Sequence, residues 1–115
     1  MQTQGQNIRR YSDYLLSRAE AFADTKYDHT QPGAIERMKA ITIDKGLLRE
    51  TQVIQGQIRL LMKCDFFSQD QENEIALTAF RLLVKDLLDL YAAMNQAVMN
   101  VLSMLLLAES TESDY

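Results

Sequence analysis

The residues that decide the fold run from Leu77 to Ala108 and read LTAFRLLVKDLLDLYAAMNQAVMNVLSMLLLA. Apolar side chains recur here at alternating steps of three and four residues, which places them along one face of an α-helix. This first stripe consists of Leu77, Phe80, Val84, Leu87, Tyr91, Met94, Val98, Val101, Leu105 and Ala108. A second stripe beside it consists of Leu83, Leu90, Ala97 and Met104. A helix with two apolar stripes is expected to pack against more than one neighbour.

Two amphipathic segments precede this helix. The spacing of apolar residues predicts a helix over residues 7–27, with Asn7 as its N-cap, and another over residues 43–63. The apolar stripe of the second segment consists of Leu47, Thr51, Ile54, Ile58 and Leu61. Gly56 lies inside this segment, so it is either a weak point of the helix or a place where another helix packs very close.

Short breaks separate the predicted helices. Pro32 ends the first helix, and residues 34–41 can form a short linker helix after it. Ser68 and Gln71 have the spacing of a capping box, which predicts that the third helix covers residues 69–108. The sequence therefore predicts an all-α fold of three main helices and a short linker helix.

The third helix is too long for the other two to cover. Residues 69–108 correspond to a rod of about 60 Å, whereas each of the other helices reaches only about 30 Å. The last third would expose a partner-helix surface, which consists of Val98, Val101, Leu102 and Leu105. Monomeric proteins rarely expose such an apolar patch, so we expect other helices or a second copy of the chain to cover it.

Length and composition are those of an ordinary single-domain protein. The 115 residues are 47 % apolar and 24 % charged, and a net charge of −4 argues against a nucleic-acid partner. All twelve Lys and Arg lie in residues 1–85, whereas residues 86–115 contain five acids and no base. Attraction to an anionic surface must therefore come from the first three quarters of the chain.

Polar ends flank the expected helical unit. Residues 1–6 and 109–115 are predicted to be disordered tails, and residues 7–108 to form a single helical unit. Neither a signal peptide nor a membrane span is expected, because the most apolar stretch, residues 97–108, is shorter than the roughly 20 residues that a span needs. A lone cysteine, Cys64, excludes an internal disulfide. These features predict a soluble, cytoplasmic protein.

No combination of residues predicts catalysis, a cofactor or a metal site. His29 is the only histidine, and we interpret it as a solvated loop side chain. Cys64 is interpreted as a small buried hydrophobe, not a reactive thiol. The acids around the start of the third helix lack the spacing of a calcium loop, and the helix dipole explains three of them; they are Asp65, Asp70, Glu72 and Glu74. We therefore expect a non-enzyme.

The basic residues supply the candidates for contact with a lipid headgroup. They are Arg9 and Arg10 near the start of the first helix, and Arg37, Lys39, Lys45 and Arg49 around the linker. Acids alternate with the second group, at Glu36, Asp44 and Glu50. A solvated face of mixed charge is therefore the favoured interpretation.

Three strings of sequence resemble consecutive helices of one family. They read IRRYSDYL at residues 8–15, KGLLRETQVIQGQI at residues 45–58 and TAFRLLVKDLLDLYAAMN at residues 78–95. Together they closely resemble the ANTH domain of clathrin assembly proteins, in that family's order and spacing over about residues 7–107. The residue usage resembles that of fungal members. The resemblance implies a right-handed α-solenoid, of which this chain would form the central helices.

The resemblance also implies partners and a location. Members of the family are endocytic adaptors that recruit clathrin coats to phosphatidylinositol 4,5-bisphosphate in the plasma membrane and bind vesicle SNAREs. The chain is therefore expected at the cytoplasmic face of clathrin-coated pits. The family's lysine-rich, histidine-containing headgroup motif has no match here, so the lipid-binding residues are unknown. The string DLLDL at residues 86–90 is similar to short clathrin-binding peptides, but Leu87 and Leu90 lie on the apolar stripes and are interpreted as helix core.

Two hypotheses about function follow. In the first, the chain is a structural part of an endocytic clathrin adaptor and acts by interaction. In the second, it is a stand-alone homo-oligomeric helical bundle without lipid binding. A small enzyme that uses His29 or Cys64 is a third class, for which the sequence indicates no substrate.

Overall fold

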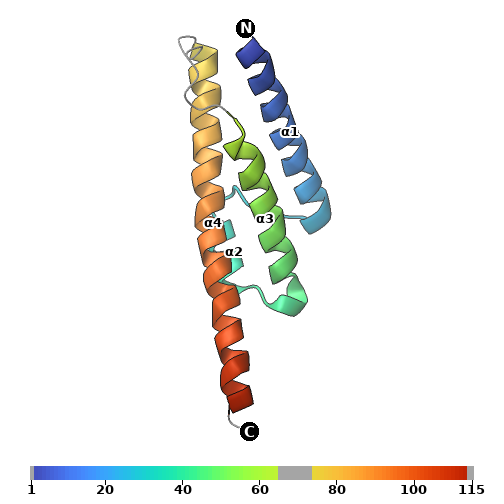
Figure 1. Cartoon of the computed structure of the whole chain (residues 1–115), viewed down its shortest axis with the longest axis vertical. Helices are drawn as coiled ribbons and strands as arrows, with labels where there is room; N and C mark the ends of the chain where they lie inside the picture. Colours follow the sequence, from blue (N-terminus) through green and yellow to red (C-terminus); the bar gives the residue numbers. More distant parts are fainter. Residues whose placement is uncertain (1, 65–73, 114–115) are drawn as a thin grey trace.

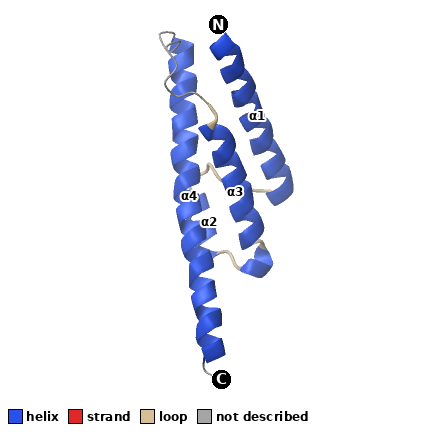
Figure 2. Ribbon diagram, viewed as in Figure 1, coloured by secondary structure: helices blue, strands red, loops and turns tan. Residues whose placement is uncertain are grey.

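The computed structural model describes the backbone of residues 2–64 and 74–113, and the side chains of residues 9–64 and 77–110. Every regular element within these ranges is a helix (Figure 2). In chain order they are α1 (Gln2–Thr25), α2 (Ala34–Ala40), the 3-10 turn η1 (Ile43–Lys45), α3 (Leu47–Met62) and α4 (Glu74–Ser113). The prediction of an all-α fold with a short linker helix is confirmed.

α4 is a rod along which the other helices pack. Its 40 residues correspond to about 60 Å, and the molecule measures 64 × 25 × 23 Å. Both α2 and α3 contact α4, and α1 packs against α3. Figure 1 shows α1 and α3 beside the N-terminal part of α4, while its C-terminal end extends beyond the other helices. The expected difference in length between the third helix and its neighbours is therefore present in the structure.

Both ends of the helical unit extend further than the sequence predicts. α1 begins at Gln2 and α4 continues to Ser113, so the segments expected as disordered tails are helical over residues 2–6 and 109–113. Once a helix exists, each further residue adds a hydrogen bond without the cost of nucleation. Gln and Glu are also good helix formers. The expected capping box at residues 68–71 lies outside the described residues.

Two residues with positive φ set helix boundaries that the periodicity did not predict. Lys26 has a φ of 61°, so α1 ends at Thr25 and not at residue 27. The hydroxyl of Thr25 closes the last turn by donating to the carbonyl of Ala21 at 2.8 Å. Gly46 has a φ of 111°, a left-handed conformation that favours glycine, and it separates η1 from α3. The helix expected over residues 43–63 therefore begins as a 3-10 turn.

The core forms where the four helices meet, and it selects one of the two stripes on α4. Its buried members are Tyr14, Ala34, Met38, Leu47, Ile54, Leu61, Leu90, Ala93 and Ala97. The stripe through Leu90 and Ala97 thus faces the core, whereas Tyr91, Val98 and Leu105 of the first stripe are 41–59 % exposed. Each buried leucine contributes on the order of 2 kcal/mol to folding.

The buried face of α3 shares Leu47, Ile54 and Leu61 with the predicted stripe and differs from it at the other two positions. Thr51 and Ile58 are only partly buried. The buried positions step by three and four residues through Leu47, Glu50, Ile54, Gln57 and Leu61. α3 therefore places a carboxylate and an amide inside the protein, and both need hydrogen-bond partners there.

Candidate functional site

Several of the basic residues proposed for a lipid headgroup are bonded to other groups of the protein. Arg10 donates to the backbone carbonyl of Lys63 at 2.8 Å, which joins α1 to the end of α3. Arg49 forms two hydrogen bonds with the carboxylate of Asp24, at 2.6 and 3.1 Å. Arg9, Lys39 and Lys45 are exposed on α1, α2 and η1 respectively. Their role in lipid binding stays a prediction.

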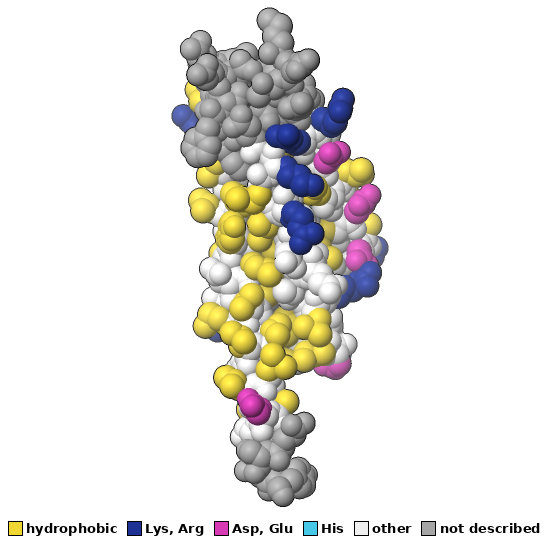
Figure 3. Space-filling view, viewed as in Figure 1, with side chains coloured by type: hydrophobic (Ala, Val, Ile, Leu, Met, Phe, Trp, Pro, Cys, Tyr) yellow, Lys and Arg dark blue, Asp and Glu magenta, His cyan; other side chains and the backbone are white. Residues whose placement is uncertain are grey.

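A further group of basic side chains was not predicted from the sequence. Figure 3 shows Lys and Arg side chains in a column over the N-terminal half of the molecule. Arg59 is exposed on α3 and Lys63 directly after it, and the backbone carbonyl of Lys63 accepts a hydrogen bond from the exposed Arg10 of α1. Arg10 and Lys63 are 53 residues apart in sequence, and the packing of α1 against α3 brings them together.

Arg37 turns inward to a buried acid. Its Nε and Nη2 donate to the two carboxylate oxygens of Glu50 at 2.8 and 2.7 Å, and its guanidinium lies 4.6 Å from the ring centre of Tyr27. His29 Nε2 lies 2.7 Å from Oε1 of the same carboxylate. Burial alone would raise the pKa of Glu50, but the hydrogen bonds from Arg37 and His29 lower it below its ordinary value. A single carboxylate thus ties α2 and the loop before it to α3.

The prediction of a solvated His29 is wrong, because its side chain is completely buried. The loop that carries it folds against α3, where His29 Nε2 lies within hydrogen-bond distance of the Glu50 carboxylate. Asp28 holds the loop in this shape by accepting hydrogen bonds from the backbone N–H and the hydroxyl of Thr30, at 3.0 and 2.8 Å. The sequence signal was Glu50 itself: it lies at helical spacing between Leu47 and Ile54, so an acid occupies the apolar face and requires a buried donor.

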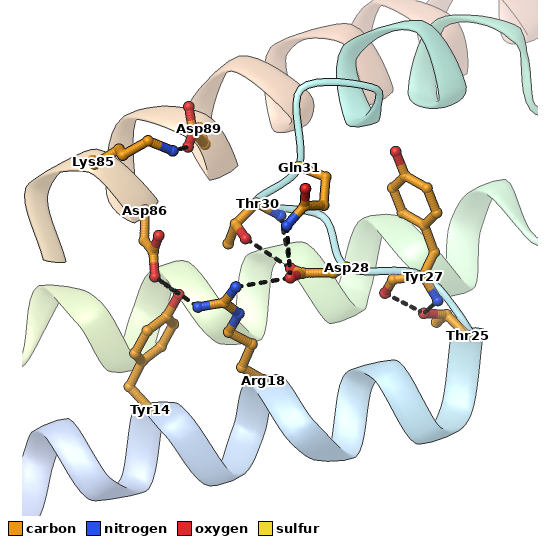
Figure 4. Close-up of polar contacts among 10 residues, drawn as sticks. All are labelled: Tyr14, Arg18, Thr25, Tyr27, Asp28, Thr30, Gln31, Lys85, Asp86 and Asp89. Carbon is orange, nitrogen blue, oxygen red and sulfur yellow. Dashed lines mark hydrogen bonds and ion pairs between the residues drawn. The ribbon is translucent and has the colours of Figure 1, made fainter. Parts of the chain in front are cut away.

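A second polar network joins α1, α4 and the same loop (Figure 4). Arg18 donates to Asp28 at 2.7 Å and to Asp86 at 3.2 Å, and the Tyr14 hydroxyl donates to Asp86 at 2.8 Å. Burial raises the pKa of Tyr14, and the hydrogen bond to Asp86 raises it further. Burial would raise the pKa of Asp28 as well, but hydrogen bonds from Arg18 and Thr30 hold it well below its ordinary value.

These contacts explain the DLLDL string of α4. Asp86 is held by α1, Leu90 is completely buried, and Leu87 packs against the core. Asp89 pairs with Lys85 one turn earlier, at 2.8 Å. The interpretation of this string as helix core is confirmed for Leu87 and Leu90, whereas Leu88 is 64 % exposed.

The C-terminal third of α4 exposes apolar side chains. Val98, Leu102 and Leu105 are 41, 54 and 59 % exposed. Val101 is an exception among the residues assigned to the partner-helix surface, because it is partly buried and packs against the core. Figure 3 shows hydrophobic side chains gathered along this face of the molecule. Their role as a partner surface stays a prediction.

Cys64 and the described acids offer no metal or thiol chemistry. The Cys64 side chain is 7 % exposed, and burial raises its pKa, which agrees with a small buried hydrophobe. Within residues 9–64 and 77–110, no three His, Cys, Asp or Glu side chains are grouped to hold a metal ion. The acids at positions 65, 70 and 72 lie outside the described residues.

By length and composition, α4 also qualifies as a helix that could cross a membrane. The segment Leu77–Ser110 contains a window with a mean hydropathy of 1.4 that is 17 % buried. The prediction that the chain has no membrane span was based on residues 97–108 alone and did not take this longer segment into account. The core helix of a soluble protein can have the same length and hydropathy. In this chain, Asp86 of the segment accepts a hydrogen bond from Tyr14 of α1.

The sequence was compared with known families, and the result agrees with the all-α structure. The profile of the ANTH domain matches residues 1–114. The chain belongs to the ANTH domain family. Family membership confirms the resemblance found in the three sequence strings. ANTH domains of clathrin assembly proteins are non-enzymatic adaptors of endocytosis, so the prediction of a non-enzyme is also confirmed.

Several known proteins are similar to this ANTH chain over most of its length. An ENTH domain-containing protein of Schizosaccharomyces pombe is 44 % identical over 101 residues, which are 86 % of this chain and 16 % of the relative. Clathrin coat assembly protein AP180 of Mus musculus is 36 % identical over 97 residues, 83 % of this chain and 11 % of its own length. Phosphatidylinositol-binding clathrin assembly protein of Rattus norvegicus is 35 % identical over 97 residues, 83 % of this chain and 15 % of its own length.

The ANTH chain is thus much shorter than these relatives, because it spans 11–16 % of their length. No solved structure matches it significantly. What the whole relatives bind therefore has to be proposed for this chain, not transferred to it.

Proposed function

We propose that the chain is a structural segment of an endocytic clathrin adaptor and acts by protein interaction at the cytoplasmic face of clathrin-coated pits. The ANTH match over residues 1–114 carries this proposal. The names of the relatives specify clathrin and phosphatidylinositol as what the longer proteins assemble or bind. The resemblance adds vesicle SNAREs as partners of full-length members.

The buried network around Glu50 and the partly buried network around Asp86 support a scaffold role. Glu50 joins α2, α3 and the loop before α2, and Asp86 joins α4 to α1. Both carboxylates accept hydrogen bonds from side chains distant in sequence, so each holds its helices in a defined arrangement. A buried charge is strongly destabilising when it loses its partners, and this penalty opposes alternative helix packings.

We assign no headgroup site to this segment. Arg37 and Arg49 are paired with acids, and Arg10 is bound to a backbone carbonyl. In the sequence, Arg59 and Lys63 are followed by the acids Asp65, Asp70, Glu72 and Glu74, which lower the net charge of this part of the chain. Electrostatic recognition of phosphoinositides usually requires a cluster of four to eight Lys and Arg.

A segment exchange tests the proposal. The matching 97 residues of the rat phosphatidylinositol-binding clathrin assembly protein would be replaced by those of this chain. We expect the chimera to assemble clathrin and to bind phosphatidylinositol vesicles as the unmodified protein does. A chimera that carries Glu50→Ala serves as the control for loss of the scaffold. If the parent chimera shows native helicity by circular dichroism but neither assembles clathrin nor binds vesicles, the proposal is wrong.

The exposed stripe of α4 favours a second candidate, a stand-alone homo-oligomeric bundle without lipid binding. The stability of an obligate oligomer depends on the concentration of its chains. A melting temperature that rises with protein concentration would support this candidate, and a constant one would exclude it.

A further inference from the structure

The loop between α1 and α2 buries the only histidine of the chain. The side chain of His29 is completely buried, and its Nε2 lies 2.7 Å from Oε1 of Glu50. The ring of Tyr27 stands edge-on to the imidazole, with 5.3 Å between the ring centres. The second ring nitrogen, Nδ1, is also buried, and it has no hydrogen-bond partner within the described residues. The site therefore offers one polar contact to a side chain that has two polar atoms.

The polar contacts of this site suit a neutral imidazole. The ionised carboxylate of Glu50 can only accept hydrogen bonds, so Nε2 of His29 carries the hydrogen that the two groups share. A neutral ring has no further hydrogen to donate. A protonated ring donates from both nitrogens, and its second N–H would be buried without an acceptor among the described residues. An unsatisfied buried donor costs more free energy when it belongs to a charged group, so the site disfavours the protonated ring.

The charge of Glu50 is already matched by another residue. Arg37 donates to both of its carboxylate oxygens, at 2.8 and 2.7 Å. A proton on His29 would thus bring a second cation to a carboxylate that is already neutralised, and one positive charge would be left in excess. Because the imidazole is completely buried, water cannot compensate this charge.

The other charged groups on the loop and on the surrounding helices are paired with one another or exposed. The pairs are Arg18 with Asp28 and Asp86, Arg49 with Asp24, and Lys85 with Asp89. The exposed groups nearest to the loop in sequence are Glu20, Lys26, Glu36, Lys39, Asp44 and Lys45. Among the described acids, only Glu50 is paired with His29, and it is shared with Arg37.

We propose that residues 26–33 form a proton-sensitive latch, which is closed while His29 is neutral and opens when His29 is protonated. In the open state the imidazole is in water, where a histidine titrates at about pH 6.5. Below this pH the open state binds one more proton than the closed state, so the latch is fully stable above it and weakens as the pH falls. Glu50 and Asp28 have pKa values below 4.5 and 3.8, so they stay ionised over this range.

Opening of the latch would free the start of α2. The N–H of Ala34, the first residue of α2, donates to the carbonyl of Gln31 at 3.0 Å, and the N–H of Gln31 donates to the carbonyl of Asp28 at 3.1 Å. The contact of His29 with Glu50 connects these turns to α3. Its loss should loosen α2 from α3 whether or not the chain engages clathrin or vesicles, so the test is separate from that of the proposed function.

Amide hydrogen exchange tests the latch. The N–H groups of Gln31 and Ala34 should exchange through its opening. After correction for the intrinsic exchange rate, we expect their protection to fall about tenfold from pH 7.5 to pH 5.5, the change for one proton bound only by the open state. His29→Gln is the matched variant, because its amide can donate to Glu50 but does not titrate; its protection should be equal at both pH values. A parent whose protection is constant or rises toward pH 5.5, or an equal fall in both proteins, would overturn the proposal.

Proton NMR of the single imidazole gives a second test on the unmodified chain, which does not depend on the folding of the variant. We expect the Cε1–H signal of His29 in the folded protein to keep its neutral position between about pH 7.5 and pH 5.5, whereas the signal of the urea-unfolded chain should titrate at about pH 6.5. If the signal of the folded chain titrates over this range while the amides of Gln31 and Ala34 stay protected, the closed loop accepts the proton and the proposal is wrong.

Discussion

Asn100 in α4 donates its side-chain amide to the backbone carbonyl of Ile41 at 2.7 Å, across 59 residues of sequence. The same nitrogen donates to the carbonyl of Met38 at 2.9 Å. Ile41 directly follows α2, so Asn100 satisfies carbonyls that the end of this short helix leaves without a partner. A polar residue within the most apolar part of α4 therefore attaches the linker helix to the long one.

Replacement of Asn100 by Ala should detach α2 from α4. We expect a loss of about 1–3 kcal/mol in the free energy of unfolding, because two backbone carbonyls lose their donor. Urea unfolding measures this loss, and amide exchange should show earlier opening of residues 34–40 than of α3. Ser103→Ala is the control, since Ser103 is exposed on the same helix. Equal unfolding free energies for the two variants would show that the amide contributes nothing.

Stability should fall at acid pH through Glu50 and Asp28. Both carboxyls have a pKa below the ordinary values of 4.5 and 3.8, so they stabilise the fold fully above those values. The contribution is lost as the pH falls through the lower pKa of the folded state. We expect Glu50→Gln to cost about 2 kcal/mol at pH 7 and to unfold with a weaker dependence on pH below 4.5. Urea midpoints between pH 7 and pH 3 measure this, with the exposed Glu20→Gln as control; an unchanged pH dependence for Glu50→Gln would refute it.

The hydroxyl of Tyr14 should matter in the opposite range of pH. Its pKa is raised above the ordinary value of 10, so the stabilisation is present below pH 10 and is lost as the pH rises above it. We expect Tyr14→Phe to cost about 2 kcal/mol at pH 7, because a hydrogen bond to a carboxylate is lost. The difference from the parent should shrink above pH 10. Urea unfolding at pH 7 and pH 11 measures both effects, and a constant difference would contradict the assignment; Tyr11→Phe provides a half-buried control on the same helix.

Two glycines of the α3 region should respond oppositely to alanine. A Cβ at Gly56 would meet nothing within 4 Å, so this residue is a weak point of the helix and not a site of close packing. Gly56→Ala should therefore stabilise the fold by about 0.5–1 kcal/mol. Gly46 has a φ of 111°, so Gly46→Ala should destabilise it by about 1 kcal/mol or more. Thermal unfolding of both variants tests the pair, and a destabilised Gly56→Ala would mean that a neighbour does approach there.

Periodicity predicts the helices because it shows which residues share a face, but it does not indicate which face becomes buried. The two stripes of α4 are nearly equally apolar, and only the approach of α2 and α3 decides that Leu90 and Ala97 lie in the core while Val98 and Leu105 do not. On α3 the apolar residues Thr51 and Ile58 fit the helical spacing as well as the buried Glu50 does. The face with the acid is buried because Arg37 and His29 supply its hydrogen bonds.

The features that the sequence did not predict depend on contacts between residues far apart in the chain. A lone histidine between polar residues is usually solvated, and nothing local to His29 indicates its burial. Its environment depends on Glu50, 21 residues further along the chain. The basic column on α1 and α3 was missed for the same reason, because Arg10 and Lys63 are 53 residues apart in sequence. Each of these sites depends on tertiary packing.

Co-sedimentation with liposomes, with and without phosphatidylinositol 4,5-bisphosphate at physiological salt, tests the central claim that this segment is a scaffold and not a headgroup site. We predict that pelleting does not depend on the phosphoinositide. Arg59→Glu/Lys63→Glu and Lys39→Glu/Lys45→Glu probe the two groups of exposed cations. Specific pelleting of the parent that either pair abolishes would contradict the account and identify those residues as a lipid-binding face.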